Sequence, residues 1–537
     1  MNPESQYDLL IVSDLHLSEG RDPKTKKFSP NEDFFFDEEF ARFLTYYQDQ
    51  TRWPGKKWHL IINGDFLDFL QVTSQRDAPA SLCRDSKHPE YGLGCGEPET
   101  VYKLKKIVQG HWQFFEALAQ FVASGNVVTI NKGNHDPEFH YAGVGAAFVD
   151  ELRAVFQRML IRDGDPDWAQ KVAKINSDAI HFVDWFYFEK GLLWVEHGNQ
   201  YDEVNSFKYW LAPFLPKIPG WPVARENEVD LPWGSLFVRY LFNEIESIDP
   251  FADNIKPQTE FVWWLFRKHP IMAVRFAFGG GRYMLEKIRR AWQPVSKEAY
   301  AAREKEHSQR LRKLAVESGI PEADLQHLDQ LRAPTVLKEP SGWKWKAIRW
   351  TARLRLILPL LFLLLVLVIL ACILAITPFL AVLVPTRIQD LVWDRWVSTS
   401  AGPRIVAALS VVRWSVFPIV IAAITGFLVW LLSGEEKKKP CYLAARAREI
   451  RQRLKVRYVI MGHTHDADLQ SIGENGEEYF NTGTWTKVFS EEERLIRKDV
   501  EFVFAQALRK NSALQAKLLE WNDETGEPKL LKLFDEQ

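Results

Sequence analysis

The chain has 537 residues, too many for one ordinary domain and enough to bury a large core. Its 68 lysines and arginines nearly balance 70 aspartates and glutamates, so no overall field recruits nucleic acid, and we expect no nucleic-acid partner. Four cysteines are too few for a disulfide framework and are typical of a reducing compartment.

The N-terminal segment MNPESQYDLLIVSDLHLS lacks a basic region followed by a long apolar core, so we expect no signal peptide and a chain that begins folding in the cytosol. Cys83 and Cys95 flank the segment RDSKHPEYGLG. Their spacing matches no common zinc or redox pattern, which leaves an ordinary surface loop as the alternative to a thiol site.

Short apolar runs that end in polar residues alternate with longer mixed stretches in the first part of the chain. The runs are YDLLIVSD, WHLIINGD, NVVTINKGN and LLWVEHGN, and a long helical stretch, YKLKKIVQGHWQFFEALAQFVASG, precedes the third. This alternation predicts an α/β fold. In such folds the loops at the carboxyl ends of the strands carry the chemistry.

Each of these predicted loops carries carboxylate, imidazole or amide side chains, and a later run, VRYVIMG, leads to two further histidines. In chain order the candidates are Asp14, His16, Asp65, Asp68, Asn134, His135, Asp136, His197, His463 and His465. One such fragment is common in proteins, whereas five in order, each at a predicted strand end, indicate a shared site. These donors, without thiolate, suit Mn²⁺, Fe or Zn²⁺, and Asp65 could bridge two ions.

The fragments SDLH, NGDFLD, KGNHD, VEHGN and MGHTH resemble the D-x-H, G-D-x-x-D, G-N-H-D/E, H and G-H-x-H motifs of the calcineurin-like metallophosphoesterase superfamily. The resemblance covers about residues 1–205 and 440–490. It implies a two-sheet α/β sandwich with two metals, Mn²⁺ first and Fe or Zn²⁺ as alternatives, at one edge between the sheets. The implied ligands are Asp14, His16, Asp65 and His465 for one ion and Asp65, Asn134, His197 and His463 for the other.

The resemblance also implies that His135 contacts the phosphate and assists the leaving group, and that Asp136 orients His135. Asp68 would support the site by hydrogen bonds rather than by ligation. A degenerate, inactive relative is the alternative, but no ligand position is substituted. The segments EYFNTGTWTKVFS and VEFVFAQ look like the last strands of that fold, and Gly483 and Thr484 lie either near the metals or in a plain turn.

Two long apolar segments predict a transmembrane hairpin. Residues 356–384 and 414–432 contain no charged side chain and would span about 43 Å and 28 Å as helices, against roughly 30 Å of hydrocarbon. Buried soluble helices are the alternative. Lysines and arginines precede the first segment and follow the second, which places both flanks, and therefore the catalytic domain, in the cytoplasm.

Four parts follow from these patterns: a first part of the catalytic core (1–205), a helical insertion (206–345), the hairpin (346–436) and a second part of the core (437–537). Residues 206–295 mix aromatic with basic side chains, which suits either the lipid headgroup region or a helical subdomain with an aromatic core. The charged stretch from Ser296 to Arg332 predicts a solvated pair of helices.

Three classes of function remain. The first is a membrane-anchored phosphoesterase whose partners are the bilayer and a lipid-linked phosphate or diphosphate. The second is a hydrolase of soluble nucleotides or phosphoproteins that uses the hairpin only as an anchor, and the third is a non-catalytic membrane scaffold. SDLHLS, GNHDPEF and EHGNQYD resemble the branch that contains UDP-2,3-diacylglucosamine hydrolases. Those enzymes carry Arg at the position of His135 and have no transmembrane hairpin.

Overall fold

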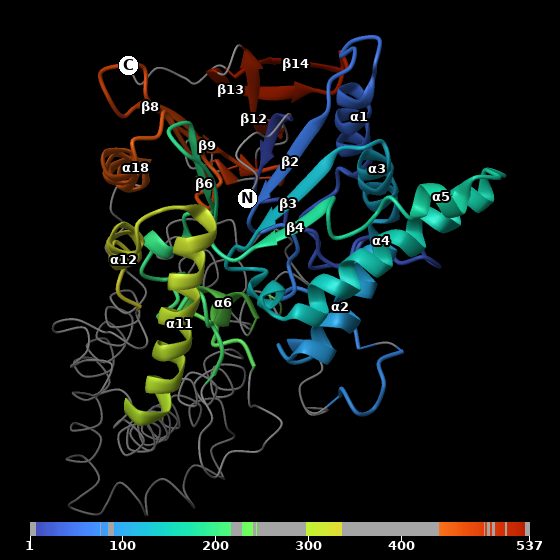
Figure 1. The fold of residues 1–537 in the computed structure, drawn as a ribbon. Coiled ribbons are helices and arrows are strands. Elements are labelled where there is room, and N and C mark those ends of the chain that lie inside the picture. Colours follow the sequence, from blue (N-terminus) through green and yellow to red (C-terminus); the bar gives the residue numbers. More distant parts are fainter. Residues whose placement is uncertain are drawn as a thin grey trace, which may run out of the picture. The chain divides into compact units, whose positions relative to one another are not determined.

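The computed structural model describes residues 7–75, 77–83, 91–215, 228–239, 243, 297–335, 440–487, 489–490, 495–496, 500–510 and 513–531, which belong to one compact unit (Figure 1). Two mixed β-sheets with flanking helices confirm the predicted α/β class. The predicted hairpin spans, 356–384 and 414–432, lie outside the described residues. Within the described part of the chain, no helix combines the length and the apolar character needed to cross a bilayer.

The larger sheet has the strand order β14-β13-β12-β1-β2-β3-β4. Its central strands β1 to β4 are parallel, and β12, β13 and β14 add to the β1 edge in antiparallel fashion. The bounds are β1 Asp8–Val12, β2 Trp58–Asn63, β3 Val127–Asn131, β4 Ile180–Val183, β12 Val503–Lys510, β13 Ala513–Asn522 and β14 Glu527–Leu530. β1 and β2 are buried along their whole length, as strands covered on both faces must be.

The smaller sheet joins segments from the two ends of the chain, in the order β5-β6-β7-β9-β8. Its strands are β5 Phe186–Glu189, β6 Leu193–Glu196, β7 Tyr458–Met461, β8 Ala467–Ser471 and β9 Glu478–Thr482, and β10 Phe489–Ser490 and β11 Leu495–Ile496 form a separate ribbon. β6 and β7 are parallel, with Leu193 opposite Tyr458 and Val195 opposite Ile460. This pairing closes the fold across the whole intervening insertion.

The main core fills the space between the two sheets. Leu9, Ile11 and Ile61 of the larger sheet meet Val195 and Ile460 of the smaller one, and all five are fully buried. Truncating one such isoleucine to alanine would cost about 2–5 kcal/mol of folding free energy because the cavity cannot collapse completely. The core therefore holds the strand ends, and the loops that leave them, in fixed positions.

Helices cover the outer faces of both sheets (Figure 1). On the larger sheet, Phe43 of the first helix packs against Phe504 of β12, and Tyr47 packs against Trp58 of β2. Leu443 of α18 lies against Gly198 and Met461, behind the smaller sheet. The helices are α1 Asp37–Gln48, α2 Glu97–Gly110, α3 Trp112–Ala123, α4 Ala142–Arg162, α5 Trp168–Val172 and α18 Pro440–Leu454.

Two helical predictions need refinement. The long stretch before β3 is two helices, α2 and α3, because the backbone of His111 leaves the helical region at φ −112°, ψ 37°. The charged pair exists as α11 Lys297–Ser318 and α12 Glu322–Gln330. It is not solvated all round, since Leu325 and Leu328 are buried. The insertion also contributes the short helix α6 Trp233–Phe237.

Candidate metal centre

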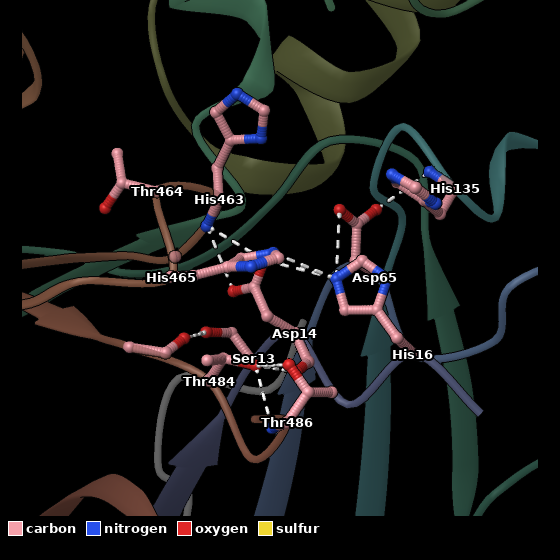
Figure 2. A network of polar contacts seen from close by, with 12 residues as sticks. Ser13, Asp14, His16, Asp65, His135, His463, Thr464, His465, Thr484 and Thr486 are labelled. Atoms are coloured by element: carbon pink, nitrogen blue, oxygen red, sulfur yellow. Dashed lines mark hydrogen bonds and ion pairs between the residues drawn. The ribbon is translucent and has the colours of Figure 1, made fainter. Parts of the chain in front are cut away.

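The loops that follow β1, β2, β3 and β7 meet at one place (Figure 2), and His197 in the loop after β6 joins them, as the sequence predicted. Their ligand atoms form three overlapping groups, each within 4.8 Å: Asp14, His16 and His465; His16, Asp65 and His135; and Asp65, His197 and His463. The first group holds three of the four ligands predicted for one ion and lacks Asp65. The third group holds three of the four predicted for the other ion and lacks the amide Asn134. Asp65 lies between them, as a bridging carboxylate must.

The first group brings two imidazole nitrogens face to face. His16 Nε2 lies 3.0 Å from His465 Nε2, and His465 Nε2 lies 3.4 Å from Asp14 Oδ1 (Figure 2). Asp65 Oδ2 is 3.9 Å from His16 Nε2. In the protein alone, one of these two nitrogens donates a hydrogen bond to the other, and a cation bound to both lone pairs could replace that hydrogen. The donor types favour a divalent transition metal.

The third group and the neighbouring Asn134 contain donor atoms that the described residues leave without a hydrogen bond. His197 Nδ1 donates to the carbonyl of Asn63 at 3.0 Å, so Nε2, 3.0 Å from Asp65 Oδ2, is the ring nitrogen that a metal ion could take in place of a proton. Asn134 is 2% exposed, and its Oδ1 has no hydrogen-bond partner among the described residues. Buried polar atoms almost always have a partner, so the orphaned Asn134 Oδ1 fits a metal ligand.

The backbone of the site is strained at the ligands themselves. Asp14, His16, Asp65, His463 and His465 all have φ between 47° and 73°. Residues other than glycine rarely adopt this left-handed conformation, and each instance costs of order 1–3 kcal/mol. Five candidate ligands share this strained conformation. We infer that the fold gives up folding free energy so that these side chains point toward one another.

Glycines in the motifs allow this close convergence. Gly64 precedes Asp65 at φ +81°, and a Cβ there would lie 2.5 Å from the His197 ring. Gly462 precedes His463, and a Cβ there would lie 2.4 Å from Asp14 Oδ2. Each glycine thus makes room for a ligand from another loop.

The acids and bases of the site shift one another's pKa values. Burial alone would raise the pKa of Asp14, but His197 and His465 outweigh it and lower the pKa to about 2. The pKa of Asp65 is held well below its usual value because nearby histidines, above all His197, overcome its burial. Conversely, Asp65 and Asp14 overcome the burial of His197 and raise its pKa to about 9. The site stabilises ionised carboxylates, which are the form that binds metal.

His135 is held by Asp68, not by Asp136 as the sequence suggested. His135 Nδ1 lies 2.5 Å from Asp68 Oδ2, while the imidazole side chain is 15% exposed. Asp136 instead accepts backbone hydrogen bonds from Gly133 at 2.7 Å and Phe66 at 2.9 Å. It joins the loops after β2 and β3, so its role is to shape the site, and the predicted contact with His135 is wrong.

Several supporting residues were not predicted. Asn63 and Asn131 end β2 and β3, and their amides donate to the carbonyls of Glu196 and Val195 in the other sheet, at 2.9 and 3.1 Å. The asparagine at the end of both WHLIIN and VVTIN was the sequence feature that could have pointed to these two residues. Thr484, which the sequence placed either near the metals or in a plain turn, donates from Oγ1 to the Asp14 carbonyl at 2.6 Å, so this turn lies beside the candidate ligands.

A buried ion cluster supports the loop after β1. Glu32 accepts hydrogen bonds from the backbone of Ser18 and Gly20 and lies 3.2 Å from His111 Nε2. His111 Nδ1 lies 2.9 Å from Asp37 Oδ1. Burial opposes the charged imidazole, but these two carboxylates outweigh it and raise the pKa of His111 to about 10.

Comparisons with protein-family models, curated proteins and solved structures found no match. We therefore infer the function from the chemistry of the site. Cys83 and Cys95 are both free thiols, and neither belongs to a candidate metal group among the described residues. The donor set is oxygen and imidazole nitrogen, which fits manganese, iron or zinc.

Proposed function

We propose that this protein is a metal-dependent phosphoesterase that hydrolyses a phosphate ester or diphosphate. The observation that carries the proposal is the convergence of the predicted ligands into neighbouring groups, with Asp65 Oδ2 3.0 Å from His197 Nε2 and 3.9 Å from His16 Nε2. The strained ligand backbones and the orphaned Asn134 Oδ1 support it. A scaffold without catalysis would have no need for such strain.

Asp14, His16, Asp65 and His465 would hold one ion, and Asp65, Asn134, His197 and His463 the other. Two divalent ions so held would polarise a phosphoryl oxygen and lower the pKa of the attacking water.

The protein's own contribution to bond cleavage centres on His135. As water attacks phosphorus, the bond to the leaving oxygen breaks, and the His135 ring delivers a proton to that oxygen. Asp68 accepts the Nδ1 hydrogen and favours the charged ring, so Nε2 is the nitrogen that faces the substrate. The partial exposure of His135 is what this contact requires.

The membrane assignment is part of the proposal. Residues 356–384 and 414–432 would form a transmembrane hairpin that keeps the catalytic domain at the cytoplasmic face, and a lipid-linked phosphate would reach the site from the bilayer. The aromatic and basic residues of 206–295 support this view by their composition. The ligands on either side of the hairpin meet in one site, so both flanks must share one compartment.

The test is an activity screen of the purified, Mn²⁺-loaded full-length protein on lipid diphosphates, phosphomonoesters, cyclic nucleotides and nucleic acids. We expect turnover of a phosphoester or diphosphate that is abolished by chelation and absent in Asp65→Asn. The surface variant Lys529→Gln is the matched control and should keep full activity. Activity that survives both chelation and Asp65→Asn would contradict the proposal.

A second experiment separates lipid-linked from soluble substrates. Replacing about residues 350–436 with a flexible Gly/Ser linker should preserve hydrolysis of a small chromogenic phosphodiester but impair turnover of a bilayer-embedded substrate. Unchanged activity on the embedded substrate would favour soluble nucleotides or phosphoproteins and reduce the hairpin to an anchor.

A further inference from the structure

His463 has a carboxylate partner outside the predicted site. Its Nε2 lies 3.2 Å from Asp202 Oδ2, across 261 positions of sequence. The side chain of Asp202 is fixed from other directions, because Oδ1 accepts the backbone N–H of Val204 at 3.0 Å and Oδ2 accepts Asn205 Nδ2 at 2.8 Å. The carboxylate is therefore a rigid reference point for the His463 ring.

This contact decides which ring nitrogen of His463 is available. An ionised carboxylate can only accept, so the hydrogen must lie on Nε2, and the lone pair is then on Nδ1. The tautomer of His197 is fixed in a similar way, because its Nδ1 donates a hydrogen bond to the Asn63 carbonyl. Histidines that bind metals generally donate their second N–H to such a partner, and loss of the partner weakens metal binding 10–100-fold.

We propose that Asp202 is a positioning residue that fixes the tautomer and orientation of His463 for metal binding. The inference rests on the proposed function, since it needs His463 to be a ligand. Asp202 does not itself reach the substrate; it acts through the ring of His463.

The surroundings of Asp202 confine its effect to one ion. It lies just after η3, Asn199–Tyr201, in the loop that begins with His197. In the same loop, the carbonyl of Val204 accepts a hydrogen bond from the N–H of Gly234 at 2.9 Å. The next residue, Ser235, donates to the carbonyl of Asn134 at 3.2 Å. Asp202 thus belongs to a segment that contains the candidate ligand His197, contacts His463 and is linked through α6 to Asn134, all three predicted for the same ion.

The test compares Asp202→Ala with Asp329→Ala in the full-length protein. Asp329 is the matched control because its Oδ2 lies 3.2 Å from His307 Nε2, a similar contact away from the predicted ligands. Mn²⁺ titration of the chelator-treated protein gives the number of equivalents and their dissociation constants. We expect Asp202→Ala to weaken one of two binding events about 10–100-fold. Asp329→Ala should leave both unchanged.

Asp202→Asn is the conservative variant. Its amide oxygen can still accept from His463, so it should recover part of the lost affinity, and it keeps the proposal testable if Asp202→Ala does not fold. Two unchanged constants in Asp202→Ala, or an equal loss in both, would overturn the positioning role while leaving the metal centre intact. A wild-type protein that binds fewer than two equivalents would overturn the proposed function as well.

Discussion

The contact between His135 and Asp68 allows a quantitative test of the proposed proton transfer. Asp68 is fully buried, and its Oδ1 accepts backbone hydrogens from Leu70 and Gln71. Its Oδ2 lies 2.5 Å from His135 Nδ1 and 3.6 Å from His16 Nδ1. A hydrogen bond to a charged group contributes about 1.5–3 kcal/mol. Asp68→Asn should therefore lower kcat by about 10–150-fold, at 1.36 kcal/mol per tenfold.

His135→Gln should cost more, about 10²–10⁴-fold, because it removes the proton donor itself. Asp68 acts through His135, so the double variant should be no slower than His135→Gln alone. The assay measures kcat on one ester with a poor leaving group and one with a very acidic leaving group, and elemental analysis follows the metals. The acidic leaving group needs no proton and should lose little.

Equal losses on both esters, or losses that multiply in the double variant, would refute this reasoning. A fall in metal content would show that His135 supports the site structurally instead. Glu138→Gln provides a buried control from the same loop whose side chain contacts none of the candidate ligands by a hydrogen bond.

Three further predictions concern the metals and the fold. Asp65→Ala should bring metal content below one equivalent because both proposed ligand sets contain Asp65, whereas His465→Ala should weaken one binding event. Full metal occupancy of Asp65→Ala by elemental analysis would exclude bridging. Gly64→Ala should displace His197 and weaken the same event as His197→Ala in a Mn²⁺ titration, since the new Cβ meets that ring. The pKa of His111 is raised to about 10 from about 6.5 when unfolded. The stability that this provides is complete below pH 6.5 and is lost as pH rises toward 10, by about 5 kcal/mol in all and about 3 kcal/mol between pH 7 and 9.5. Chemical denaturation at pH 7 and 9.5 should show this loss in the wild type and not in His111→Gln.

The sequence was sufficient for the strands that carry the site. WHLIIN and VVTIN became β2 and β3, and VRYVIMG and EYFNT contain β7 and β9, because apolar β-branched runs that end in turn residues have a local signature. The candidate ligands were predictable for the same reason, since each follows such a run. β5 and β14 were not predicted: both are only four residues long, and EPKL has no apolar alternation.

Contacts between distant residues could not be predicted. The local sequence around Asp202 does not indicate its contact with His463. The motif GNHD places Asp136 next to His135 in sequence, but Asp68 is the residue that contacts the His135 ring. Such pairs depend on how two loops fold back toward one another, which only the assembled sheets determine. The break at His111 has a similar origin, because its buried carboxylate partners belong to a segment far earlier in the chain.

The parallel pairing of β6 with β7 has a consequence for biosynthesis. Roughly 270 residues separate His197 from His463, and ribosomes add about 5–20 residues per second, so tens of seconds pass between the two ligands. During that time the nascent chain has two strand edges without their final neighbours, β1 awaiting β12 and β6 awaiting β7. Exposed edges pair readily with other chains, which makes this interval the most vulnerable to aggregation. The emerging polypeptide also lacks two of its histidine donors, so on the proposed mechanism no phosphoester can be cleaved until the segment with His463 and His465 has been translated.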